Sequence, residues 1–157
     1  MRMFLSHPTQ SRKAIRSWQM HIKEDLNVCL LNPFYDFKDQ EVMTTADICN
    51  YNIEEMEEHI KNFPHLVLHD LKNLLSCNAV VAIFDENYCV GVPMEMVYAK
   101  NSDMKVYSIV VNGRHNNPFI RYFSDKVYLS FDEFANDFTK KRCKKALKVN
   151  EVSKKKR

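Results

Sequence analysis

The six-residue run 79–84 (Ala-Val-Val-Ala-Ile-Phe) is apolar at every position. A strand with one face in water alternates apolar and polar side chains, whereas a run that is apolar on both faces is typical of a central parallel strand covered by helices on both sides. This segment therefore constrains the chain to a layered α/β architecture more strongly than any other part of the sequence.

The remaining pattern alternates strands with helices, which predicts a doubly wound, mainly parallel five-stranded sheet with helices on both faces, of the Rossmann or flavodoxin-like kind. We expect one domain over residues 1–147 and a basic tail over 148–157. The expected strands are 3–6, 28–31, 79–84, 106–111 and 127–129. The expected helices are 10–25, 53–76 with a break near Pro64, 93–101, 118–123, and 131–147 capped by Ser130 with Glu133 three residues on.

Composition sets limits on the class of protein. A chain of 157 residues has the length of one domain, and no apolar run approaches the ~20 residues that span a bilayer. The N-terminus does not resemble a signal peptide, and the five cysteines are scattered with no paired or metal-ligand spacing. We therefore expect a cytoplasmic protein with reduced thiols, no metal site and no membrane partner.

The positive charge gathers after Lys140. Such a run either attracts nucleic acid or forms a solvated helix end and terminus. No aromatic residue interleaves these lysines, as binders of single strands require, so we do not expect a nucleic-acid partner.

Two carboxylates stand on either side of the apolar run. Gly91 and Pro93 follow it, and Pro93 is favoured in a first helical turn, so Glu95 should lie in that turn above the carboxyl end of the strand. There the helix dipole should keep Glu95 ionised, as a nucleophile toward an anomeric carbon requires, and Asp70 is the candidate general acid. The alternative from residue type alone is a dipole partner at Glu95 and a solvated helix residue at Asp70.

The string Gly-Val-Pro-Met-Glu-Met-Val-Tyr-Ala at 91–99 resembles the G-x-x-x-E-x-G-Y-A signature of the nucleoside 2-deoxyribosyltransferase family. Its superfamily includes the 2'-deoxynucleoside 5'-phosphate N-hydrolases. Asp70-Leu71 resembles the family's D-L-x-x-I-x-x-x-D helix, and 105–107 its G-K-x-V strand. The likeness covers roughly residues 2–135, but only 70–99 is specific.

The resemblance implies a mechanism without a cofactor. Glu95 would attack C1' of the deoxyribose and form a deoxyribosyl ester, with Asp70 assisting. Tyr98 would set the orientation of the carboxylate, unless it is simply a packed helix residue. A nucleobase acceptor would then take the sugar in a transferase, which is the expected activity. Water would take it in the alternative, a 2'-deoxynucleoside 5'-monophosphate N-hydrolase.

Several positions depart from the family pattern. Val97 stands where the family has its middle glycine, and Asn78 where it has an acid. Cys89 stands where transferases carry an aspartate and the hydrolases tend to carry a serine, which leaves the choice of acceptor open. Asp85 either substitutes for that aspartate or is an ordinary acid at a loop start. Because of these departures, an alternative function of another class stays open, that of a non-catalytic nucleotide-binding protein.

Further candidates for substrate binding come from the loops that follow the strands. The loop after the first strand, with Thr9, Ser11 and Arg12, forms either an anion site or a helix cap made by Thr9 or Ser11. The aromatic residues after the second strand either stack on the base or cover the edge of the core. The family's relatives are dimers or higher oligomers, so we expect a homo-oligomer. The full candidate set is Ser6, His7, Asn32, Phe34, Tyr35, Asp85, Cys89, Gly91, Met94, Asn117 and Ser124.

Overall fold

The computed structural model describes residues 1–37, 63–87 and 89–140. Its sheet has five strands in the order β2-β1-β3-β4-β5, all parallel to their neighbours. The strands are β1 (Arg2–Ser6), β2 (Cys29–Leu31), β3 (Ala79–Phe84), β4 (Lys105–Val110) and β5 (Lys126–Tyr128). The predicted fold class is confirmed, with β3 as the central strand that its apolar sequence indicates.

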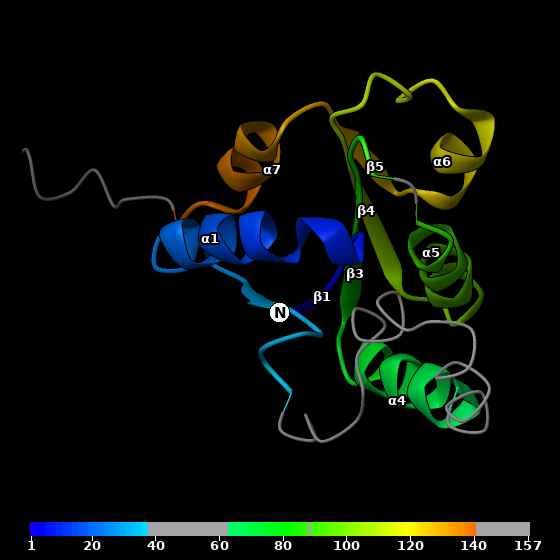
Figure 1. The fold of residues 1–157 in the computed structure, drawn as a ribbon. Coiled ribbons are helices and arrows are strands. Elements are labelled where there is room, and N and C mark those ends of the chain that lie inside the picture. The colour runs from blue at the N-terminus through cyan, green and yellow to red at the C-terminus, as the bar shows by residue number, and fades with distance from the viewer. Residues whose placement is uncertain (38–62, 88, 141–157) are drawn as a thin grey trace, which may run out of the picture.

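Helices cover both faces of this sheet, as Figure 1 shows. On one side lie α1 (Arg12–Ile22), which follows the short 3-10 turn η1 (Thr9–Ser11), and α7 (Phe131–Phe138). On the other side lie α4 (Phe63–Leu75), α5 (Gly91–Asn101) and α6 (Pro118–Phe123). The layering follows from the two cores described next.

The side chains of β1 alternate between the two cores, as the pleat of a strand requires. Met3 and Leu5 join Phe134 and the aromatic side chains of α1 and α7 on one face. Phe4 joins the buried residues of α4 and α5 on the other face. Ser6 shares the face of Phe4, so the strand directs its hydroxyl toward α5.

Strand order also fixes where a ligand can bind. β1 has β2 on one side and β3 on the other. The chain therefore first connects β1 to β2 on one side, and then crosses to β3 on the other side. In such sheets a crevice opens outside the carboxyl ends of the strands at this switch point. Here the switch point lies between β1 and β3, which end at Ser6 and Phe84.

Several predicted boundaries are corrected. α5 begins at Gly91, so Glu95 is its fifth residue and its first turn holds no acid. The predicted helix 131–147 is too long, because α7 ends at Phe138 and Thr139 is extended and bridges Leu26. The predicted cap is present, since Ser130 Oγ accepts from Glu133 N at 3.1 Å.

The predicted helix 10–25 is also divided, into η1 and α1. Neither Thr9 nor Ser11 makes a side-chain capping bond, so that interpretation of the loop is wrong. The first part of the predicted helix 53–76 and the basic tail 148–157 lie outside the described residues. Across the described ranges, no helix has both the length and the apolar character needed to cross a membrane.

Candidate active site

Three side chains from three elements meet near the carboxyl end of β1. Ser6, fully buried at the last position of β1, donates its hydroxyl to Glu95 Oε2 at 2.5 Å. Asp70, midway along α4, lies close enough for its charge to act on Glu95. The structure therefore brings together the two carboxyl groups that the sequence analysis paired, and adds a hydroxyl bound directly to one of them.

The ionisation of these carboxyl groups differs from the expectation. Burial is the main cause that raises the pKa of Glu95 to about 7; the bond from Ser6 opposes this rise, and the negative charge of Asp70 adds a smaller contribution to it. Burial also raises the pKa of Asp70, against the effect of His69. The expected stabilisation of the Glu95 anion by a helix dipole is wrong here, because Glu95 lies beyond the first turn and burial of its carboxyl group disfavours the charged form.

Tyr98 and Met94 lie on the outer side of α5. Both side chains are exposed, and they are four residues apart on one face of the helix. Within the described residues, the hydroxyl that contacts Glu95 is that of Ser6, not that of Tyr98. The role predicted for Tyr98, to orient the Glu95 carboxylate, stays a prediction.

Next to Ser6, a buried polar pair lines the ends of β1 and β2. Burial lowers the pKa of His7, and its Nδ1 lies 3.0 Å from the Pro8 carbonyl oxygen. The neutral ring therefore keeps its proton on Nδ1 and leaves Nε2 as an acceptor. Asn32 is fully buried, and its side chain lies close enough to His7 to raise the pKa of that ring against the effect of burial. In the described part of the chain, neither Asn32 Nδ2 nor His7 Nε2 makes a hydrogen bond of ordinary geometry. Buried polar atoms without partners are rare, and here one acceptor and one donor of this kind lie at the ends of β1 and β2.

Phe34 packs against His7 with ring centroids 5.1 Å apart, so it is placed beside this polar pair. The turn that carries it is held by Asp36, which accepts from the backbone N–H of Asn32 at 2.8 Å and from Arg16 at 2.6 Å. These bonds hold the pKa of Asp36 below its usual value despite partial burial. Tyr35 turns away, toward the Arg16 guanidinium 5.1 Å from its ring centroid.

Asp85 follows β3 and ties three loops together. Its carboxylate accepts from the Ser11 hydroxyl and, at 2.8 Å, from the backbone N–H of Asn87. Its carbonyl oxygen accepts from Asn112 Nδ2 at 2.8 Å. Asp85 thus lies at the crevice where it was predicted, with both carboxylate oxygens already bound by the protein.

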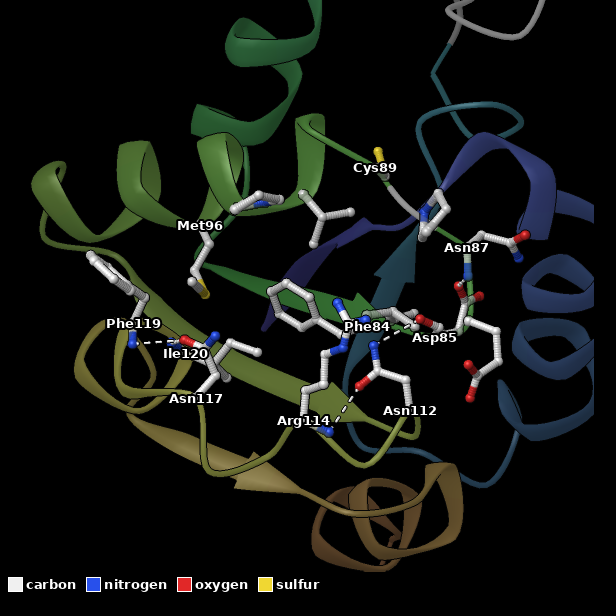
Figure 2. A pocket seen from close by; sticks show the side chains of 15 residues that line it. Phe84, Asp85, Asn87, Cys89, Met96, Asn112, Arg114, Asn117, Phe119 and Ile120 are labelled. Atoms are coloured by element: carbon white, nitrogen blue, oxygen red, sulfur yellow. Dashed lines mark hydrogen bonds between the residues drawn. The ribbon is translucent and has the colours of Figure 1, made fainter.

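A cleft of about 380 Å³ opens beside this network, between the ends of β3 and β4 and the helices α5 and α6 (Figure 2). Its floor is apolar and includes Phe84, Met96 and Ile120. Cys89 and Asn117, two predicted substrate contacts, line it, although Asn117 Oδ1 also caps α6 by accepting from Phe119 N at 2.9 Å.

Sequence reasoning missed Arg114. It lines the cleft, and Figure 2 shows its side chain extending inward beside Phe84. It lies after Gly113, whose φ of 77° forms the turn that returns the chain to the cleft. The only available signal was the position of this turn after a strand, which does not single out one basic residue.

The last two candidates take structural positions. Gly91 begins α5, and a Cβ placed on it would lie 3.6 Å from Cys89 Sγ. Ser124 makes hydrogen bonds to Ser108 Oγ at 2.7 Å and to the Ile120 carbonyl oxygen at 2.6 Å. Both bonds hold it within the protein. Among the described residues there is no cluster of three His, Cys, Asp or Glu side chains that could hold a metal ion.

Comparison with known proteins adds evidence on the fold. The chain matches no protein-family model and no curated protein. A conserved protein from Enterococcus faecalis V583 superposes with a TM-score of 0.58 at 14% identity, over 87% of this chain and 95% of that one. A CMP N-glycosidase from Clostridium botulinum superposes with a TM-score of 0.48 at 15% identity, over 87% of this chain and 97% of that one. At these identities the similarity supports the α/β fold alone.

Proposed function

We propose that this protein cleaves the N-glycosidic bond of a 2'-deoxynucleoside through Glu95 and transfers the sugar to another nucleobase. One observation carries the proposal. Glu95 is a largely desolvated carboxyl group held by Ser6 beside Asp70 at the switch point of the sheet. Such an arrangement is costly for folding, and strongly shifted carboxyl groups in a crevice are typical of catalytic sites.

In this mechanism the ionised Glu95 attacks C1' of the sugar. The C1'–N bond breaks, its electron pair leaves with the base, and an ester forms between C1' and a Glu95 oxygen. A pKa of about 7 suits this role, because a large fraction of Glu95 is ionised near neutral pH while the carboxylate keeps little hydration to lose.

Asp70 is the proposed acid. Its raised pKa favours the protonated form, and the mechanism requires the proton of the pair to lie on Asp70, ready for the departing base, while Glu95 attacks as the anion. The negative charge of one carboxyl group also disfavours ionisation of the other, so the pair tends to hold one proton in total. In the second half of the reaction a ring nitrogen of the incoming base attacks C1' and gives its proton to the Asp70 carboxylate, while the ester bond breaks and Glu95 leaves as the carboxylate.

The buried pair His7 and Asn32 supports a nucleobase as the leaving or entering group. An acceptor at His7 Nε2 and a donor at Asn32 Nδ2 match the alternating donors and acceptors on the edge of a base. Phe34 lies against His7 and provides an aromatic face.

A second candidate is the hydrolysis of a deoxynucleoside 5'-monophosphate, and Arg114 favours it. This guanidinium extends into the cleft, and it makes no side-chain ion pair with the described residues, so it is available to a phosphate. Asp85 does not compete for it directly, because its carboxylate accepts from Ser11 and Asn87.

A chromatographic time course tests both candidates. Deoxynucleosides and their monophosphates are incubated with and without adenine as acceptor, and the free and exchanged bases are quantified. Base exchange that requires an acceptor supports the transferase, and free sugar or sugar phosphate formed without acceptor supports the hydrolase. Saturable nucleotide binding with no turnover would overturn both.

Glu95→Ala is the matched catalytic variant, and Glu86→Ala is its control, because Glu86 is an exposed glutamate at the rim of the cleft. The first change should abolish turnover and the second should leave base release from unphosphorylated deoxynucleosides measurable. Unchanged turnover in folded Glu95→Ala would contradict the proposed nucleophile.

A further inference from the structure

Three positions form a row across the sheet beneath α5. Ser6 on β1 pairs with Ala82 on β3, and Ala82 pairs with Ser108 on β4. All three are fully buried. The small Ala82 side chain separates two serine hydroxyls that both face α5. These two hydroxyls have different hydrogen-bond partners.

Ser108 contacts groups that carry no charge. Its hydroxyl lies 3.7 Å from Met96 Sδ and 2.7 Å from Ser124 Oγ. Ser6 instead donates to Glu95 Oε2 at 2.5 Å. Because β1 is held on both sides by β2 and β3, the position of the Ser6 hydroxyl is set by the sheet rather than by a mobile loop.

We propose that Ser6 is a positioning residue that fixes Oε2 of Glu95 and leaves Oε1 as the oxygen that attacks the sugar. This inference rests on the proposed function of Glu95. A carboxylate held at one oxygen cannot rotate freely, so its second oxygen is presented in one direction. Glu95 Oε1 receives no hydrogen bond from the described residues, as an attacking oxygen requires.

The same contact adjusts the charge of Glu95. Ser6 is the hydrogen-bond donor that stabilises the anion, against burial and against the charge of Asp70. Other titratable or charged side chains stand on the elements packed against α5, but Asp70 is the one whose charge acts on Glu95. Among the side chains that the structure describes, those others are Arg2 on β1, His69 and Lys72 on α4, Lys105 and Tyr107 on β4, and Arg121 and Tyr122 on α6.

The test is the Ser6→Ala variant, whose kcat/KM is measured as a function of pH. A hydrogen bond to a charged group stabilises it enough to move a pKa by about one unit. The acidic limb is the part of the profile where the rate falls because Glu95 takes up a proton. Loss of the bond should move this limb to a pH about one unit higher. Below the limb the ionised fraction then falls about tenfold, and well above it the two enzymes have nearly the same ionised fraction. The loss of kcat/KM should therefore be about tenfold greater at pH 6 than at pH 9.

Two further variants separate this role from general damage to the core. Ser108→Ala removes a buried hydroxyl from the same row and should leave the acidic limb in place. Ser6→Thr keeps the hydroxyl and should return the acidic limb to its wild-type pH. If the Ser6→Thr protein does not fold, Ser6→Cys is used in its place. Equal losses at all pH values, or the same shift in Ser108→Ala, would overturn the inference.

A direct titration makes the inference independent of turnover. The carbon-13 signal of the Glu95 carboxyl group, assigned by its absence in Glu95→Gln, should titrate about one unit higher in Ser6→Ala than in the wild type. An unmoved signal would overturn the role of Ser6 even in an active enzyme. If the wild type releases no base from any substrate while the signal moves, the proposed function fails and the contact between Ser6 and Glu95 stands.

Discussion

Replacing Glu95 by glutamine should make the folded protein more stable at alkaline pH. In the folded state the pKa of Glu95 is about 7, against 4.5 in an ordinary chain. The folded protein therefore holds this proton more tightly than the unfolded chain does. Between these two values the wild type loses stability as pH rises, because unfolding then releases the proton and restores the hydration of the carboxylate. Glutamine carries no such charge and avoids the loss.

The size of the effect follows from the same two values. One pKa unit corresponds to about 1.4 kcal/mol, so the whole shift is worth roughly 3 kcal/mol once Glu95 is ionised. Integrated between pH 5 and pH 8, the advantage of Glu95→Gln over the wild type should grow by about 2.5 kcal/mol.

Urea unfolding of both proteins at pH 5 and pH 8 measures this growth. Other titrating groups are common to both proteins and cancel in the difference. Glu24→Gln, at an exposed glutamate beside Lys23, is the control. It measures how the loss of a surface carboxyl group changes the free energy of unfolding. A stability difference between wild type and Glu95→Gln that is the same at both pH values would refute the claim that the fold desolvates this carboxylate.

Three other substitutions test separate parts of the structure. Asp70→Asn removes the charge that raises the pKa of Glu95, so the carbon-13 titration of Glu95 should move to lower pH, and an unmoved titration would show that the two carboxyl groups are not neighbours. Phe134→Ala removes a fully buried ring that packs on Tyr128 and Trp18, and should cost about 3–5 kcal/mol in urea unfolding. Ser130→Ala removes the cap of α7 and should cost about 1 kcal/mol, whereas a neutral result would mean that solvent replaces the bond to Glu133 N.

Much of the architecture is predictable from local pattern. The apolar run of β3 indicates a central strand, and the alternation along β1 places Ser6 on the same face as Phe4. Ser130 with Glu133 marks the start of α7 because the capping chemistry is local. These features depend on residues close in sequence, so a single chain contains the information.

The chemistry of the site was less accessible. Pro93 suggested that α5 starts later than it does, and the resulting first-turn position made Glu95 look like a stabilised anion. The contact between Ser6 and Glu95 joins residues 89 positions apart, and the one between Ser11 and Asp85 joins residues 74 apart. Burial and partners of this kind are set by tertiary packing, which no local pattern encodes.

The most direct test of the central claim is a search for a sugar attached to Glu95. A deoxynucleoside with fluorine at C2' should slow breakdown of the ester, since fluorine disfavours positive charge at C1'. Mass spectrometry of the digested protein should then find the fluorinated sugar on the peptide that contains Glu95, and no such adduct in Glu95→Gln. Base release by Glu95→Gln at the wild-type rate, or a sugar carried on a different residue, would contradict the account.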